Sequence, residues 1–193
     1  MTRTLQQLAK GIDRATAAVG AVALWCCLYV VVIEFATVVM RYALGLGSIR
    51  LQESVLYAHG GLFMLAAAWT LQRDGHVRVD IIYGAAGPRL RACIDLAGTL
   101  IFLMPFAAAL ALLSTPYVER SWAILEHSRE SSGLPFVYLF KTLIPVFAVL
   151  LGLQGIAQAI RAGLVLFGSP METPFPPTGQ ASPPSVESIG RAR

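Results

Sequence analysis

The hydrophobic pattern of the chain consists of four long apolar segments separated by short polar stretches. The apolar segments cover about residues 15–40, 54–71, 92–118 and 134–160. A helix needs about 20 apolar residues to cross the hydrocarbon core of a bilayer, and each segment is close to that length or longer. The pattern therefore predicts an all-α membrane protein whose four transmembrane helices form one domain over residues 15–165.

The two ends of the chain differ from these segments. Residues 1–14 place Leu5, Leu8 and Ile12 on one helical face and basic residues elsewhere, which is typical of a short interfacial helix at the membrane surface. We expect this helix to run directly into the first span. Residues 169–193 hold six of the eleven prolines among serine, threonine and glycine, and this composition predicts a disordered tail.

Prolines also interrupt two of the predicted spans. Pro105 lacks a backbone donor and predicts a kink in the third span, and Pro116 predicts that this helix breaks near its end. Pro145 lies within the fourth span.

The composition agrees with a membrane protein and gives an orientation. Hydrophobic residues make up 56% of the chain and charged residues only 13%, with a mean hydropathy of +0.65. The net charge of +4 comes from basic residues at span ends, so we interpret it as a topology signal and not as a nucleic-acid surface. Ten basic residues fall on the side of the two termini and five on the other, which predicts that both termini are cytoplasmic.

A polar octapeptide, residues 73–80, follows the second span, and five of its eight residues are ionisable when the histidine is counted. One interpretation is a cytoplasmic anchor of positive charge between two spans. The other is a contact surface for a partner. The candidate residues of this loop are Arg73, Asp74, Gly75, His76, Val77, Arg78 and Asp80.

Four ionisable residues fall inside the predicted spans, and each should find a partner because a charge facing lipid is costly. They are Glu34, His59, Asp95 and Lys141. Glu34 and Lys141 each lie about six residues from the outer end of a span, so we predict that they pair. The alternative is that Lys141 extends alone to the interface while Glu34 binds a neighbouring hydroxyl.

The other two residues suggest structural roles. Asp95 lies one turn into the third span, where nearby arginines are candidates to neutralise it. A single histidine on an apolar helix, such as His59, is more simply a hydrogen-bonded packing residue than a ligand.

The sequence offers little for catalysis or cofactor binding. Of the three histidines only His59 lies within a span, whereas a membrane haem needs histidines that face each other. Neither a glycine-rich phosphate loop nor a His-Glu-x-x-His helix occurs, and the three cysteines have no disulfide or zinc spacing. We therefore expect no enzymatic activity, no metal and no cofactor.

Several short motifs occur in a fixed order along the spans. They are Arg41-Tyr42 closing the first span, Glu53 opening the second, Gly75-His76-Val77-Arg78-Val79-Asp80 after it, and Ser132-Gly133-Leu134-Pro135 with Lys141 and Pro145 in the fourth. In this order the chain resembles the small membrane subunit, of DctQ type, of tripartite ATP-independent periplasmic (TRAP) transporters over about residues 15–160. Many members of that family open the second span with a tryptophan and two adjacent acids, whereas this chain has the single acid Glu53.

The resemblance implies a scaffold subunit of an importer that couples sodium to the uptake of an organic acid in the bacterial inner membrane. It implies two partners besides the lipid bilayer: a large permease subunit of DctM type, which carries the substrate and sodium sites, and a periplasmic solute-binding protein. Outer-face contact residues would then include Arg41, Tyr42, Glu53, Trp122, Gly133 and Pro135. The alternatives are a membrane anchor of a redox enzyme and a free-standing helical protein.

Overall fold

The computed structural model describes residues 2–76, 83 and 86–168, and within them the chain is helical without strands. Its elements are α1 (Thr2–Leu44), α2 (Ile49–Gln72), α4 (Pro88–Gly98), the π-helical turn η1 (Thr99–Leu103), α5 (Met104–Ala123) and α6 (Val137–Leu166). Because α4, η1 and α5 follow one another without a gap, they form a single span from Pro88 to Ala123. The predicted all-α fold with four helices apolar and long enough to cross a membrane is confirmed. The tail, residues 169–193, lies outside the described residues.

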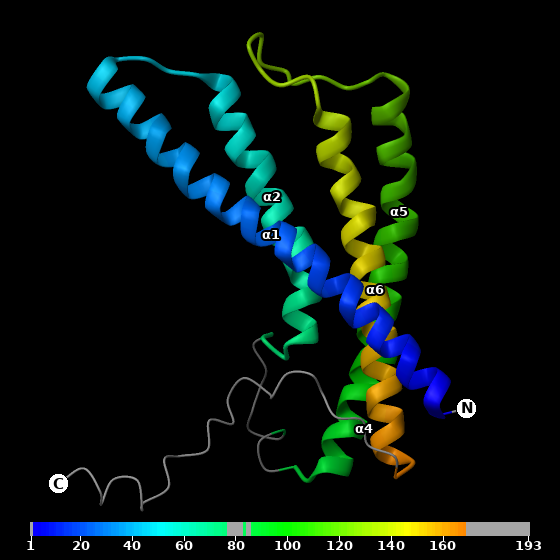
Figure 1. The fold of residues 1–193 in the computed structure, drawn as a ribbon. Helices are drawn as coiled ribbons and strands as arrows, with labels where there is room; N and C mark the ends of the chain where they lie inside the picture. Colours follow the sequence, from blue (N-terminus) through cyan, green and yellow to red (C-terminus); the bar gives the residue numbers. More distant parts are fainter. Residues whose placement is uncertain (1, 77–82, 84–85, 169–193) are drawn as a thin grey trace, which may run out of the picture.

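Helix α1 is one continuous element of 43 residues. It joins the predicted interfacial segment, residues 1–14, to the first span, as the sequence suggested. At about 1.5 Å per residue it is roughly 65 Å long, about twice the thickness of the hydrocarbon core. The helix crosses α2 and α6 obliquely (Figure 1), which accommodates part of this excess length. The position of its first turns at the membrane surface stays a prediction.

The third span deals with its two prolines in different ways. Just before Pro105 the helix widens into η1, and the backbone N–H of Met104 bonds to the carbonyl of Thr99, five residues earlier. Such a turn is a common site of helix distortion, so the disturbance expected at Pro105 takes the form of a π-turn. The predicted break at Pro116 is wrong, because α5 continues through this residue to Ala123.

The two residues before Pro116 in α5 carry hydroxyl groups that donate to the backbone of the same helix. Thr115 Oγ1 donates to the carbonyl oxygen of Ala111 at 2.7 Å, and Ser114 Oγ donates to the same oxygen at 3.3 Å. Farther along, Arg120 Nε donates to the carbonyl oxygen of Pro116 itself. These bonds go to carbonyls other than that of Leu112, the carbonyl that loses its backbone donor at Pro116.

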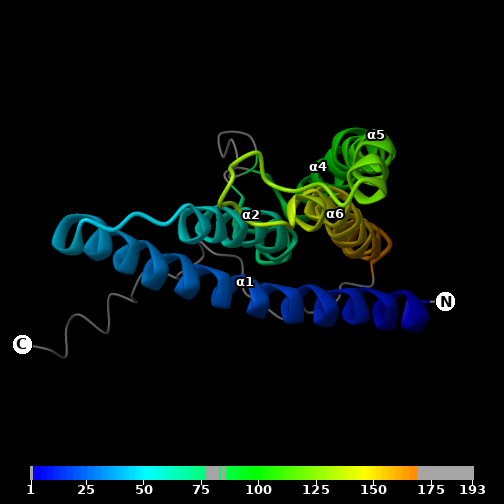
Figure 2. The same cartoon turned by 90° about the horizontal axis from the view of Figure 1, so that it is seen from above.

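Helix α6 is the centre of the arrangement, because it contacts α1, α2, α4, η1 and α5. Seen from above, α1 lies along one side of α2 and α6, and α4 and α5 lie beyond α6 on the other side (Figure 2). The spans thus form a staggered array with α6 in the middle. Any group that fixes a helix to α6 therefore helps to fix the whole fold.

Three glycines allow the helices to approach closely. Gly20 in α1 lies against the Trp69 ring of α2, Gly60 in α2 against the Phe140 ring of α6, and Gly155 in α6 against Leu103 of η1. A Cβ atom at any of these three positions would lie closer than 3.0 Å to its neighbour. Small residues are the usual means by which membrane helices pack, since the hydrophobic effect contributes little between helices in lipid.

We predict that Gly20→Ala and Gly60→Ala lower the stability of the protein, because each added methyl group overlaps a ring that is already packed. The expected cost is about 1–3 kcal/mol. Gly11→Ala in α1 and Gly163→Ala in α6 are matched controls, since a Cβ there meets nothing within 4 Å. Both controls should be neutral or stabilising, because alanine has the higher helix propensity. Thermal unfolding in detergent measures the difference, and equal effects at all four positions would contradict the assignment.

Candidate functional site

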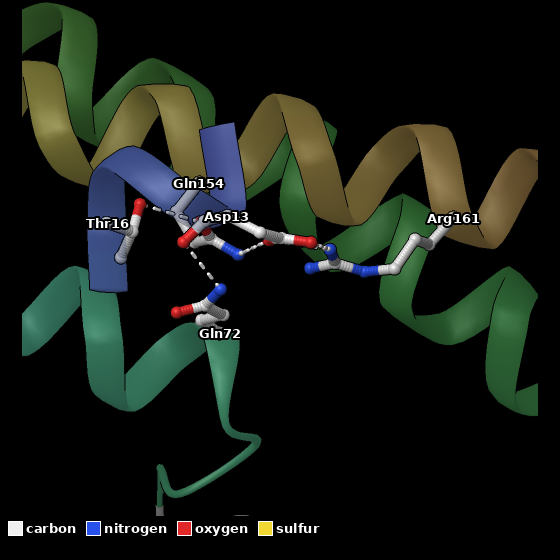
Figure 3. A network of polar contacts seen from close by, with 5 residues as sticks. All are labelled: Asp13, Thr16, Gln72, Gln154 and Arg161. Atoms are coloured by element: carbon white, nitrogen blue, oxygen red, sulfur yellow. Dashed lines mark hydrogen bonds and ion pairs between the residues drawn. The ribbon is translucent and has the colours of Figure 1, made fainter. Parts of the chain in front are cut away.

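Two polar clusters hold the helices together, and the first, the inner cluster, comprises Asp13, Thr16, Gln72, Gln154 and Arg161 (Figure 3). The buried carboxylate of Asp13 in α1 faces the guanidinium of Arg161 in α6, with Nη1 3.0 Å from each carboxylate oxygen. A buried carboxylate needs such a partner, because removing a charge from water is expensive. The ion pair therefore fixes the crossing of α1 over α6.

Amide groups complete the inner cluster. Gln154 in α6 is fully buried; its Nε2 donates to Asp13 Oδ1 at 3.2 Å, and its Oε1 accepts a hydrogen bond from Thr16 Oγ1 at 3.0 Å. Gln72, the last residue of α2, donates from Nε2 to the backbone carbonyl of Asp13 at 2.9 Å. One acidic residue thus links α1, α2 and α6.

No motif in the sequence indicated this cluster. Arg161 counted only among the basic residues at span ends, and neither Asp13 nor Gln154 was a candidate. The available signal was Gln154, an amide within an apolar helix, which has the same need for a partner as the charged residues that were considered. Asp13 fell in the predicted surface segment, where a carboxylate needs no explanation.

We predict that Asp13→Ala and Arg161→Ala each destabilise the protein by about 2–4 kcal/mol, because each leaves an unpaired charge among the helices. The double variant should lose less than the sum, with a coupling of about 1 kcal/mol or more. Chemical or thermal unfolding in detergent measures the cycle. Arg14→Ala, which removes an exposed arginine of the same helix, is the control and should have little effect. Additive losses would rule out the pairing.

The second cluster, the outer cluster, comprises Arg50 and Glu53 of α2 and Ser128, Ser132 and Leu134 of the loop of residues 124–136. It fastens this loop to the start of α2. Glu53 accepts hydrogen bonds from the Ser128 hydroxyl and from the backbone N–H of Leu134, the latter at 2.6 Å. One turn of helix before Glu53, Arg50 Nε donates to the Ser132 carbonyl at 3.3 Å. The acid that opens the second span is therefore an internal anchor for this loop.

Gly133 explains why the loop can approach Glu53 so closely. A Cβ at this position would lie within 3.0 Å of Ser128 and of Glu53 Oε1. The predicted contact residues Glu53 and Gly133 thus meet each other within the chain. Pro135 follows them and is exposed.

We predict that Gly133→Ala loosens the loop of residues 124–136, since the methyl group must displace the Ser128 or Glu53 side chain. A loss of about 1–3 kcal/mol in local stability would raise tryptic cleavage at Arg129 roughly tenfold or more. Gly47→Ala is the matched control, because a Cβ there meets nothing within 4 Å. Unchanged cleavage in the Gly133 variant would contradict the close contact.

Lys141 belongs to the same end of the fold, and its partner corrects a prediction. Its Nζ lies 2.5 Å from Glu126 Oε2, and the same oxygen accepts a hydrogen bond from Ser121 Oγ at 2.7 Å. The predicted pairing of Lys141 with Glu34 is therefore wrong. Depth alone suggested Glu34, whereas the loop folds back and brings Glu126 to the first turns of α6.

The environment of Glu126 stabilises its charged form. Hydrogen bonds from Lys141 and Ser121 lower the pKa of the Glu126 carboxyl below its ordinary value. A lowered pKa means that the stabilisation is present above the ordinary glutamate pKa and is lost as the pH falls below it. Lys141 Nζ also lies 4.1 Å from the centroid of the Tyr117 ring, so the ion pair joins α5, the loop and α6.

Three other predicted outer-face residues differ in their surroundings. Trp122 Nε1 donates to Thr142 Oγ1 at 2.9 Å, and its ring packs edge-on against Tyr138, so this tryptophan joins α5 to α6. Arg41 and Tyr42 are exposed at the end of α1. Like Pro135, these two are available for contacts of the kind that the sequence suggested, and Trp122 is itself 43% exposed.

The described part of the octapeptide, residues 73–76, directly follows the end of α2, with Arg73 as the C-cap residue. Arg73 lies over the Trp69 ring at 4.3 Å, Asp74 has a positive φ of 57°, and Gly75 donates its N–H to the Thr70 carbonyl. The side chain of His76 is exposed. Val77, Arg78 and Asp80 lie outside the described residues, so the proposed role of the whole loop stays a prediction.

The remaining in-span candidates are separated from each other. Asp95 accepts a hydrogen bond from the Tyr83 hydroxyl at 2.9 Å, and Arg91 Nε donates to the Tyr83 carbonyl. His59 is exposed on α2, with its ring 4.9 Å from that of Phe63. Among the described residues, no group of three or more histidine, cysteine, aspartate or glutamate side chains is placed to hold a metal ion.

A comparison with protein families assigns the chain. The family model for the DctQ component of tripartite ATP-independent periplasmic transporters matches residues 30–163. The chain belongs to the DctQ family. Comparisons with curated proteins and with solved structures give no match. Membership identifies a transporter subunit and not an enzyme, which favours the scaffold interpretation over the redox-enzyme anchor.

The matched region includes the whole outer cluster and most of the inner one. It begins in the middle of α1 and ends within the last turn of α6, so Asp13 and Thr16 precede it. The DctQ-matching part of the chain thus supplies three members of the inner cluster, Gln72, Gln154 and Arg161. The first turns of α1 supply the carboxylate.

Proposed function

We propose that this chain is the small membrane subunit of a TRAP-type symporter that imports an organic acid with sodium across the bacterial inner membrane. Its partners would be a large permease subunit of DctM type and a periplasmic solute-binding protein. The observation that carries this proposal is the DctQ match, which extends over parts of all four candidate spans.

The way in which the polar residues are used supports a scaffold role. The charged side chains form ion pairs within the chain, Asp13 with Arg161 and Lys141 with Glu126, and these pairs fix the helices to each other. Helices fixed to each other in this way suit a frame against which another subunit moves. In this proposal the large subunit carries the substrate and sodium sites, and the small subunit does no chemistry.

The surface of the spans supports a membrane location and a helical partner. Large apolar side chains are exposed on several helices: Trp25, Phe35, Phe63, Phe102, Leu112 and Leu113. In water such a surface would be a liability, whereas lipid tails and the helices of another membrane subunit both cover it.

The charge distribution supports an orientation with both termini and the octapeptide in the cytoplasm. In this orientation the outer cluster faces the periplasm, on the side from which a binding protein delivers its solute. Arg41 and Tyr42, which are exposed at that end of α1, are then candidate contacts for the partners.

Co-expression of the tagged chain with its large subunit tests the proposal. The two should co-purify after mild detergent extraction, and sodium-dependent uptake into proteoliposomes should require both subunits and the binding protein. A tagged chain that is recovered alone, or uptake that proceeds without it, would overturn the proposed function.

We predict that His76→Ala weakens assembly or uptake without changing which solute is transported, because the octapeptide contacts a partner and not the substrate. Recovery of the large subunit and competition between solutes for uptake measure the two effects. His127→Ala, which removes an exposed histidine from the loop at the other end of the spans, should leave recovery of the large subunit unchanged. An altered solute preference in the His76 variant would contradict the scaffold role.

A further inference from the structure

A row of exposed residues runs along one flank of α1. Its members follow the alternating spacing of four and three residues that is typical of a helix seam packed against another helix. They are Cys27, Val31, Glu34, Val38 and Arg41, and all five are exposed. Val31 is 62% exposed and Val38 is 45% exposed, so the structure leaves this seam uncovered.

Glu34, in the middle of the seam, lies in an apolar stretch of α1. The sequence before it is Val30-Val31-Val32-Ile33, and Phe35 and Ala36 follow. Its carboxylate makes no hydrogen bond or ion pair with any described residue. An ionisable side chain within a span normally faces protein or water and has a partner, because lipid cannot solvate it.

Among the described residues, two basic side chains that could have served Glu34 are engaged elsewhere: Lys141 pairs with Glu126, and Arg161 pairs with Asp13. Arg41 lies on the same seam but seven residues farther on, which is about 10 Å along the helix axis. In the described part of the chain Glu34 is therefore left open to a partner from another molecule.

We propose that this seam docks a transmembrane helix of the large permease subunit, which brings a basic or hydrogen-bond-donating side chain to Glu34. The inference rests on the proposed function, because it takes the large subunit as the occupant. Val31 and Val38 pack on either side of the polar contact. A single polar residue in such a seam fixes the register of the two helices.

Charge complementarity selects a different chain over a second copy of this one. In a symmetric contact between two copies, the same patch meets itself, so two Glu34 carboxylates would come together. A helix of another subunit avoids this repulsion and can place a donor at Glu34. Two turns farther along, Arg41 selects an acidic or carbonyl group on the same helix.

The first test is Glu34→Leu, measured by co-purification of the co-expressed large subunit with the tagged chain. We expect recovery to fall about tenfold or more, because the partner's donor loses its acceptor in lipid. The unfolding temperature of the isolated variant should be unchanged, since Glu34 has no internal partner. Glu119→Leu, which removes an exposed glutamate of α5, is the matched control and should keep wild-type recovery.

Each other result would overturn the inference. Wild-type recovery with Glu34→Leu would mean that Glu34 does not contact the large subunit. A less stable isolated variant would mean that its partner lies within this chain. An equal loss in the Glu119 variant would mean that the position of the carboxylate does not matter.

Photo-cross-linking locates the contact independently of stability. Val31→p-benzoylphenylalanine should cross-link to the large subunit under illumination, because Val31 lies in the seam. Trp25→p-benzoylphenylalanine is the control: Trp25 is 71% exposed but lies nine residues from Glu34, which places it on the opposite side of the helix. Cross-linking from position 25 and not from 31 would overturn the proposed seam.

These outcomes are distinguishable from a failure of the proposed function. If the wild-type chain does not co-purify with the large subunit, the proposed function fails before any variant is compared. If the wild-type pair is recovered and transports solute while the Glu34 and Val31 variants give the contrary results, the proposed function stands and only the location of the contact is wrong.

Discussion

The ion pair between Asp13 and Arg161 is the interaction on which the arrangement of the helices depends. Both side chains are largely buried, so little water solvates either charge and each charge compensates the other. Gln154 and Gln72 add hydrogen bonds to Asp13 from α6 and α2, and the oblique helix α1 is thereby held at one place along both. In the same arrangement Gly20 packs against Trp69 and Gly60 against Phe140.

The other end of the fold is also held together by polar contacts, but there a loop supplies them. There the loop of residues 124–136 carries the polar groups, and it returns to α2 through Glu53 and to α6 through Glu126. The two clusters lie at opposite ends of α2, at Glu53 and at Gln72. A helix fastened at both ends has little freedom to tilt against its neighbours, which is the property that the proposed scaffold role needs.

The sequence predicted the four helices that are long and apolar enough to cross a membrane, because long apolar segments have few alternatives to membrane helices. It also led to the correct family through the order of short motifs. It failed where the outcome depended on how segments meet. Lys141 was assigned to Glu34 from depth alone, Pro116 was expected to end a helix that continues, and Asp13 was not connected with Gln154. Pairing of distant residues depends on helix rotation and loop path, which hydropathy does not specify.

The π-turn in the third span has a consequence for how this helix faces α6. Besides Val118 it has five buried residues, Ala92, Thr99, Ala107, Ser114 and Ser121, which are spaced by seven, eight, seven and seven positions. The single interval of eight contains η1 and Pro105. The wider turn absorbs the additional residue, so the frame shift in the sequence does not rotate the second half of the span away from its neighbour. The small buried side chains thereby stay on one face of the helix, although one interval between them is a residue longer than the others.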